Sequence, residues 1–200
     1  MWQIILAAGW PIWPLIIASV VAVAIIGERS FALREHLISP KNLLPEVQKW
    51  LAAGQINKDM ITRLEQNSHL GRVFATALAT AKQSRDVTKE SIEETARAVA
   101  HDLEKYLATL GTIATVAPLL GLLGTVIGMV ELFGAFTTTG HDVAQFARGI
   151  SVALYNTAAG IVVAVPAMIA YRFFRTKVDT ILIDMEQQAI KLVEILHGER

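Results

Sequence analysis

The sequence predicts an all-α, polytopic membrane protein whose three transmembrane helices extend into a cytoplasmic helical bundle. Two charge-free apolar runs, residues 107–130 and 149–171, each exceed the roughly 20 helical residues that a bilayer core requires. A third apolar run covers residues 10–27. No Lys or Arg precedes Glu28, so the basic region of a cleaved signal peptide is missing and we expect a retained span. Hydrophobic residues make up 53% of the chain, above the share of an ordinary soluble domain.

These spans divide the chain into six expected segments. They are an outer-face N-terminus with the first transmembrane helix (1–27), a cytoplasmic helical region (28–106), the second transmembrane helix (107–136), an outer loop (137–148), the third transmembrane helix (149–174) and a cytoplasmic C-terminal helix (175–200). The orientation follows from positive charge, which accumulates at the cytoplasmic ends of spans. The outer loop carries Arg148 alone, whereas the opposite ends carry Arg29, Arg34, Lys89, Arg97, Lys105, Arg172, Arg175 and Lys177.

Local signals set the expected helix ends. The helix of the first span should continue beyond the membrane and end before Ser39. Thr88 is expected to cap a helix that runs without a break into the second span, to about Phe136. Asp142, with Gln145 three residues later, resembles a capping box at the start of the third span.

Small residues recur along one face of each of the last two spans. On the second span they are Ala114, Ala117, Gly121, Gly124, Gly128 and Ala135, with Glu131 on the same stripe, and on the third they are Gly149, Ala153, Asn156, Thr157, Gly160, Ala164 and Ala167. Small side chains let helix backbones approach closely in lipid, where association depends on packing. We therefore expect both stripes to face other helices, with Gly121, Gly124, Gly128 and Gly160 as packing positions.

Composition and motifs exclude several classes of function. The 18 basic and 18 acidic residues balance, which gives no support for nucleic-acid binding. The chain has no cysteine, so thiol nucleophiles and thiolate metal sites are excluded. No P-loop, HExxH, GxSxG or GxGxxG motif occurs, and the five His residues show no metal-binding spacing. We expect neither an enzyme nor a bound cofactor or metal.

Polar residues within the spans are the remaining candidates for function. The hydroxyls of Thr112, Thr115 and Ser151 are expected to bond to carbonyls of their own helix. Asn156 and Thr157 lie close to the middle of the third span, where either a tie between helices or a position lining an ion path fits. Glu131 is acidic and lies at the outer end of the second span, so it either acts in transport or simply reaches interfacial water.

Two motifs on the paired spans resemble the MotA/TolQ/ExbB proton channel family. They are GLLGTVIG at 121–128, and GISVAL at 149–154 followed by TAAG at 157–160 and VPA at 165–167. The resemblance is closest to ExbB and TolQ, covers about residues 107–175 at motif level, and extends to the whole chain in its three-span layout. Members of the MotA type carry four spans and fit less well.

The resemblance implies a homo-oligomer, expected to be a pentameric ring, whose second and third spans surround a lumen. A single-span ExbD/TolR-like partner would occupy that lumen, and its membrane Asp would carry protons, the transported ion. Motion driven by proton flow would then pass to a TonB- or TolA-like protein. The implied location is the bacterial inner membrane, with the N-terminus periplasmic and the C-terminus cytoplasmic.

The same resemblance assigns roles to individual positions. Thr125 and Thr157 match lumen threonines of ExbB and TolQ. Val152 stands where those proteins have a membrane glutamate, so the partner's Asp would be more nearly the sole proton carrier. Glu131 occupies a position that is polar but uncharged in relatives, and it could partly compensate.

Two hypotheses of different class follow from these observations. The first is a proton-conducting motor subunit with an ExbB-like role in energising outer-membrane transport, or alternatively a TolQ-like role in envelope maintenance. The second is a non-conducting scaffold that assembles envelope proteins, which the missing carboxylate at Val152 favours. The small-residue stripes and the matched threonines favour the motor. The sequence leaves the subunit number and the choice between protons and sodium open.

Overall fold

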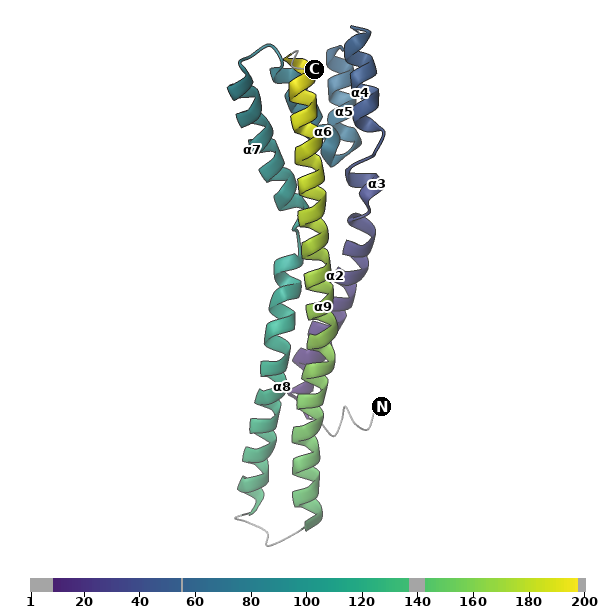
Figure 1. Cartoon of the computed structure of the whole chain (residues 1–200). Helices are drawn as coiled ribbons and strands as arrows, with labels where there is room; N and C mark the ends of the chain where they lie inside the picture. Colours follow the sequence, from purple (N-terminus) through teal and green to yellow (C-terminus); the bar gives the residue numbers. More distant parts are fainter. Residues whose placement is uncertain (1–8, 55, 137–142, 198–200) are drawn as a thin grey trace. The chain divides into compact units, whose positions relative to one another are not determined.

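The computed structural model describes residues 9–54, 56–136 and 143–197, and the regular elements in these ranges are all helices (Figure 1). The predicted all-α class with three membrane-spanning helices is therefore confirmed. The chain divides into two compact units. The membrane unit comprises Met1–Glu28 and Tyr106–Phe173, and the cytoplasmic unit, named after its expected location, comprises Arg29–Lys105 and Phe174–Arg200.

Three helices long and apolar enough to cross a bilayer occur in the described residues. They are α2 (Ile12–Ala32), α8 (Leu107–Phe136) and α9 (Val143–Leu196). A small core of Leu15, Ala117 and Ala164, one residue from each helix, is almost completely buried. Residues 137–142, which include the first half of the expected outer loop and the capping-box residue Asp142, lie outside the described residues.

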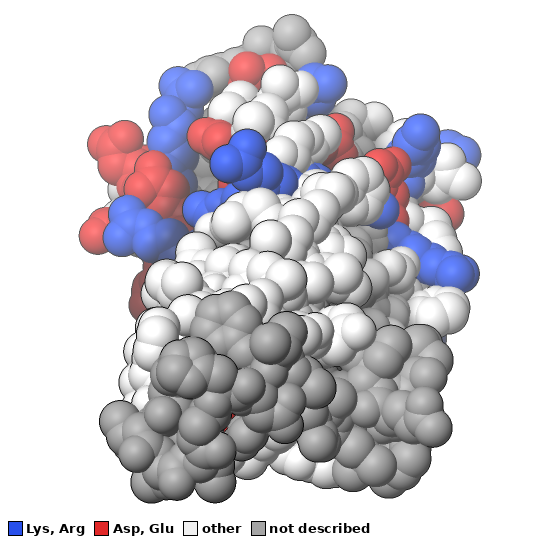
Figure 2. All heavy atoms as spheres, turned by 90° about the horizontal axis from the view of Figure 1, so that it is seen from below, with Lys and Arg blue, Asp and Glu red and all other residues white. Residues whose placement is uncertain are grey.

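The outward faces of these spans are apolar and exposed. They carry large side chains that include Ile17, Val23, Leu122, Val126, Leu154 and Val162. The space-filling view shows a broad white surface without Lys, Arg, Asp or Glu side chains (Figure 2). Such a surface suits lipid or the apolar face of another subunit, because neither requires polar groups on the helix exterior.

The cytoplasmic unit is a bundle organised around α6. It contains α3 (Glu35–Ile38), α4 (Leu43–Ala52), α5 (Lys58–Asn67), α6 (His69–Thr80), α7 (Arg85–Leu103) and the C-terminal part of α9. Helix α6 packs against α5 and α7 and buries Leu70, Phe74 and Ala77 completely. Its first turn is capped by Ser68, whose hydroxyl oxygen accepts a hydrogen bond from the Gly71 amide at 3.0 Å.

A polar cluster ties the turn after α3 to the C-terminal part of α9. The Ser39 hydroxyl donates to the Asp184 carboxylate at 3.1 Å. The Gln188 amide donates to both groups, at 3.1 Å to Ser39 and 2.8 Å to Asp184. Ser39 is buried, so these bonds replace the water that its hydroxyl loses on folding.

The prediction of one unbroken helix from Thr88 to Phe136 is wrong. Helix α7 ends at Leu103, and α8 begins at Leu107 after Tyr106, which has a φ of 63°. One residue in the left-handed region redirects the chain without any glycine or proline to announce the break. The apolar positions keep helical spacing on both sides of Tyr106, so their periodicity hides the interruption.

Two further predicted helix ends are also wrong. Ser84 caps α7 by accepting a hydrogen bond from the Val87 amide at 3.5 Å, whereas Thr88 is fully buried and donates to the Thr80 carbonyl at 3.0 Å. Helix α2 ends at Ala32, and α3 forms a separate turn before Ser39. Ser and Thr both belong to the preferred capping residues, so residue type alone distinguishes Ser84 from Thr88 only weakly.

Gly71 allows α6 to lie against α5. A Cβ atom at this position would overlap the Leu64 carbonyl oxygen, and the overlap involves backbone rather than a flexible side chain. We expect Gly71→Ala to lower the free energy of unfolding by about 1–3 kcal/mol. Thermal unfolding should show a lower midpoint, while the control Ala79→Ser, at an exposed position of the same helix, should leave it nearly unchanged. Equal midpoints for Gly71→Ala and the wild type would contradict the close packing.

The side chain of His69, at the start of α6, should make the stability of this unit depend on pH. Burial lowers the His69 pKa below its ordinary value of 6.5, and nearby Arg72 lowers it further while Asp102 opposes both. The unfolded chain then binds the proton first, so stability is lost as pH falls through 6.5. Between pH 7.5 and 5.5, His69→Gln should therefore lose less thermal stability than the wild type. Parallel pH profiles would show that His69 is not linked to folding.

Candidate functional site

The backbones of α8 and α9 approach each other closely at two facing glycines. A Cβ at Gly121 would lie 2.8 Å from the Asn156 carbonyl oxygen and 3.2 Å from the Thr157 Cα. A Cβ at Gly160 would lie 2.7 Å from the Ala117 carbonyl oxygen and 3.1 Å from the Gly121 Cα. Real Cβ atoms do not approach so closely, so the backbones meet here because both side chains are absent. The two small-residue stripes thus face each other within one chain.

Asn156 is enclosed in this contact. Its side chain is fully buried, and its Nδ2 donates to the Val152 carbonyl at 3.1 Å. A Cβ at Gly124 would lie 2.6 Å from the Asn156 Cβ and 2.7 Å from its Cγ, so Gly124 provides the space that this side chain fills. Asn156 thus packs between the two helices, and the bond to Val152 stays within α9.

Most hydroxyls of the spans bond to their own helix. Thr112 and Ser151 each donate to the carbonyl four residues earlier at 2.9 Å, Thr115 donates to the Gly111 and Thr112 carbonyls, and Thr125 donates to the Leu122 carbonyl at 2.6 Å. For Thr112, Thr115 and Ser151 this is the predicted arrangement. Thr125 keeps the same local bond, and it lies four residues beyond Gly121 on α8.

Thr157 differs from these residues. Its Oγ1 is buried and has no hydrogen-bond partner among the described residues. An unsatisfied buried hydroxyl costs about 1–3 kcal/mol, so such groups are rare and call for a cause. Thr157 also lies at the glycine contact, because its Cα is the atom that Gly121 approaches. The site therefore contains one buried hydroxyl whose hydrogen-bonding capacity is unused among the described residues.

At the outer end of the contact, Leu132 and not Glu131 lies against α9. Glu131 is exposed, whereas the next residue, Leu132, is 5% exposed and lies where a Cβ at Gly149 would be 2.7 Å from its Cδ1. Leu132 thus continues the α8–α9 contact face after Gly128, and Glu131 lies outside this contact. One helical turn is 3.6 residues, so positions 131 and 132 both lie close to one turn after Gly128. The apolar residue of the two, Leu132, is the buried one.

Val152, for which the resemblance implies a glutamate in relatives, contributes its carbonyl to Asn156 and is partly buried. It brings no titratable group to the α8–α9 contact. Among the described residues, no three His, Asp or Glu side chains lie close enough together to hold a metal ion. The chemistry of this site is therefore that of close helix packing with hydroxyl and amide groups.

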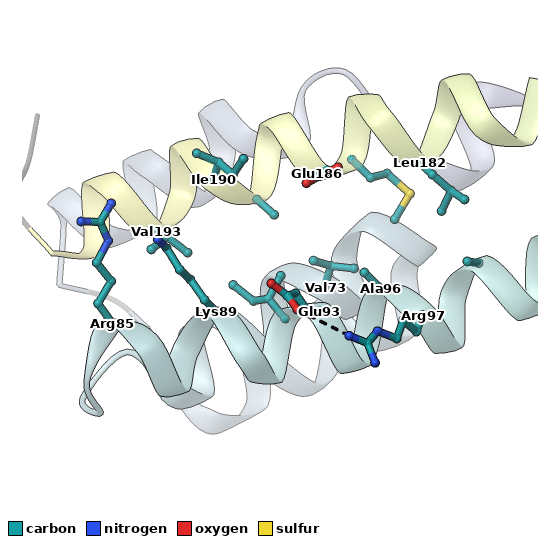
Figure 3. Close-up of a pocket in the computed structure, with 14 residues that line it drawn as sticks. Val73, Arg85, Lys89, Glu93, Ala96, Arg97, Leu182, Glu186, Ile190 and Val193 are labelled. Carbon is teal, nitrogen blue, oxygen red and sulfur yellow. Dashed lines mark ion pairs between the residues drawn. The ribbon is translucent and has the colours of Figure 1, made fainter.

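The cytoplasmic unit contains a separate groove of about 520 Å³ between α7 and the C-terminal part of α9. Its apolar lining includes Val73 and Val193, and Lys89 and Glu186 lie at its edge (Figure 3). Glu93 and Arg97 form an exposed ion pair of 3.6 Å on the α7 side (Figure 3). This mixture of both charges around an apolar floor specifies no particular ligand.

The sequence of this chain is similar to a family of membrane proteins and to several of its named relatives. The model of the MotA/TolQ/ExbB proton channel family matches residues 65–187. The chain is 31% identical to biopolymer transport protein ExbB-like 3 of Synechocystis, over 86% of this chain and 83% of the relative. It is 31% identical to biopolymer transport protein exbB1 of Vibrio cholerae, over 80% and 72%. It is also 36% identical to the Tol-Pal system protein TolQ of Haemophilus influenzae, over 48% and 43%.

Two glycines of α8 provide a matched pair of substitutions. Gly121→Ala would place its Cβ against the α9 backbone, whereas a Cβ at Gly128 would meet Ala153 at 3.5 Å, an ordinary contact. We expect Gly121→Ala to destabilise the α8–α9 pair by about 1–3 kcal/mol and Gly128→Ala to have little effect. Thermal unfolding in detergent would measure both. Equal behaviour of the two variants would mean that the backbones are not in contact at Gly121.

Proposed function

The chain belongs to the MotA/TolQ/ExbB proton channel family, and we propose that it is the ExbB-like subunit of a proton-driven motor in a bacterial inner membrane. In this proposal the N-terminus is periplasmic and the C-terminus is cytoplasmic. The motor converts the proton motive force into work on a TonB-like protein for outer-membrane transport. Relatives named for biopolymer transport, each covered over more than two thirds of its length, support this role above the others.

The proposed assembly is a homo-pentameric ring around a single-span ExbD/TolR-like partner. The exposed apolar faces of α2, α8 and α9 support a ring, since each subunit has large uncharged surfaces for its neighbours and for lipid. The third span has no charged residue between positions 149 and 171. This supports a division of labour in which the partner's carboxylate carries the proton and this subunit provides the surface along which it moves.

The observation that carries the proposal is the buried Thr157 hydroxyl without a partner in the described chain. A hydroxyl both donates and accepts, so it can bond to a protonated or an ionised carboxyl or to a water molecule. Together with Thr125 it forms the proposed proton path, with Glu131 at its outer end and Asn156 holding the helices that frame it. One charge that crosses 100 mV releases about 2.3 kcal/mol, comparable to one or two such hydrogen bonds.

A non-conducting scaffold is the second candidate, and Val152 is the observation that favours it. Without a carboxylate on the third span, this subunit has no proton carrier of its own at mid-membrane. A TolQ-like role in envelope maintenance is a variant of the motor, supported by the similarity to TolQ over about half of this chain. The scaffold and the motor differ in whether ions flow when the partner is present.

Substitution of Thr157 tests the proton path. Thr157→Val removes the hydroxyl and keeps the volume, so we expect partner-dependent proton flux into proteoliposomes to fall at least about tenfold, the effect of losing roughly 1.4 kcal/mol of stabilisation. Assembly should be retained. Thr115→Val is the matched control, because Thr115 carries the same hydroxyl but lies outside the proposed path, and it should conduct normally.

Three outcomes separate the candidates. Unchanged flux in Thr157→Val would remove Thr157 from the path. Loss of the oligomer in this variant would assign Thr157 to packing. Absence of flux in the wild type reconstituted with its single-span partner would favour the scaffold.

A further inference from the structure

A pocket of about 620 Å³ lies in the cytoplasmic unit, where the chain turns from α2 through α3 into α4. Its lining comes from residues 34–36 and 39–42 of this turn and from one residue of α9. The ionisable side chains among them are three cations, Arg34, Lys41 and Lys177, one carboxylate, Glu35, and His36. We call this site the cationic pocket. Because its positive groups outnumber its negative one, the pocket attracts anions.

The cations of this pocket have no counter-charge in the part of the chain that the structure describes. None of Arg34, Lys41 and Lys177 forms an ion pair with a described residue. The Cζ of Arg34 lies 4.8 Å from the centroid of the Phe31 ring, a contact that orients the guanidinium. Lys177 is partly buried. Withdrawing a charge from water without a counter-charge costs free energy, so Lys177 indicates an anionic ligand.

Helix α4 begins at the same pocket and adds to its positive potential. Asn42, the N-cap residue of α4, lines the pocket, and its side chain makes no capping hydrogen bond. The N-terminal end of a helix carries the positive pole of the helix dipole, which stabilises a nearby anion. The Leu43 amide donates to the Pro40 carbonyl at 3.0 Å, so the contribution of this helix end is its dipole rather than that N–H group.

The pocket residues follow closely after two of the apolar spans. Arg34 lies seven residues after the charge-free run 10–27, and Lys177 lies six residues after the run 149–171. At 1.5 Å per helical residue, Lys177 is about 9 Å along α9 from the end of its run. The headgroup layer extends roughly 5–8 Å beyond each side of the bilayer core, and a Lys side chain can bend back toward it. The Lys177 ammonium can therefore reach lipid phosphates.

Exposed apolar side chains beside the cations select between a lipid and a soluble anion. The exposed fractions are 64% for Phe31 and 53% for Leu37. A soluble anion would leave these side chains in water, whereas a phospholipid brings acyl chains to cover them. We propose that the cationic pocket binds the phosphate group of an anionic phospholipid such as phosphatidylglycerol. This inference goes beyond the proposed motor, because it requires only that the chain spans a membrane.

Native mass spectrometry of the full chain in detergent, titrated with phosphatidylglycerol or phosphatidylcholine, measures this binding. We expect the wild type to bind phosphatidylglycerol at least about tenfold more tightly than the zwitterionic phosphatidylcholine. Lys41→Gln and Lys177→Gln should each raise the dissociation constant for phosphatidylglycerol about fivefold, which corresponds to about 1 kcal/mol. Lys177→Arg keeps the charge and should bind nearly as well as the wild type. Glu35→Gln removes the one carboxylate of the pocket and should tighten binding about twofold.

Lys49→Gln is the matched control for the loss of one positive charge. Lys49 is exposed on α4 and does not line the pocket, so this variant should bind phosphatidylglycerol nearly as tightly as the wild type. Equal weakening by Lys49→Gln and Lys177→Gln would overturn the site, since it would show attraction to net charge alone. If Lys177→Gln does not fold, Arg34→Gln and Lys41→Gln, both at exposed positions, make the same comparison.

Competition with sn-glycerol 3-phosphate distinguishes a lipid from a soluble phosphate. This compound carries the phosphate group without acyl chains, so at 10 mM, a concentration on the order of weak phosphate binding, it should change the dissociation constant for phosphatidylglycerol less than about twofold. Complete displacement of phosphatidylglycerol from the wild type would overturn the lipid and assign the pocket to a soluble phosphate compound. Equal affinity of the wild type for phosphatidylglycerol and phosphatidylcholine would overturn the selection of an anion.

Discussion

The backbone contact between α8 and α9 at Gly121 and Gly160 is the constraint on which the membrane unit depends. In lipid, apolar side chains gain nothing by leaving the solvent, so helices associate where their shapes allow a close fit. The two glycines bring the backbones together, and Gly124 leaves room for Asn156. In this contact the small-residue faces of α8 and α9 pack against each other within one chain. The large apolar faces that remain exposed are then the surfaces available to neighbouring subunits and lipid.

The same contact explains why one hydroxyl stands out. Four other hydroxyl-bearing residues of the α8–α9 pair satisfy their donors locally, as residues at unrestricted positions in a helix can do. Thr157 lies at the glycine contact and its oxygen has no such bond in the described residues. In the proposed motor, this hydroxyl is the group of the subunit that would bond to the carboxyl or the water that carries the proton.

Much of the fold could be predicted from the sequence because a bilayer imposes a length and a polarity on each span. The three spans and the continuation of α9 beyond the membrane follow from charge-free runs and helical spacing. The break at Tyr106 could not be predicted, since a left-handed residue other than glycine has no compositional signal. The stripes identified the packing faces but not their partner, because spacing alone does not tell a contact within a chain from one between subunits. Helical spacing also did not decide whether residue 131 or residue 132 lies against α9, because both are about one turn after Gly128. In the structure the buried residue is Leu132.

Native mass spectrometry of this chain, purified together with a single-span ExbD/TolR-like protein from the same organism, tests the central claim most directly. A motor subunit should give a fixed complex of several copies of this chain, five in the proposed ring, around two copies of the partner. Oligomers of this chain that never retain the single-span protein would contradict the motor and leave the scaffold as the better account.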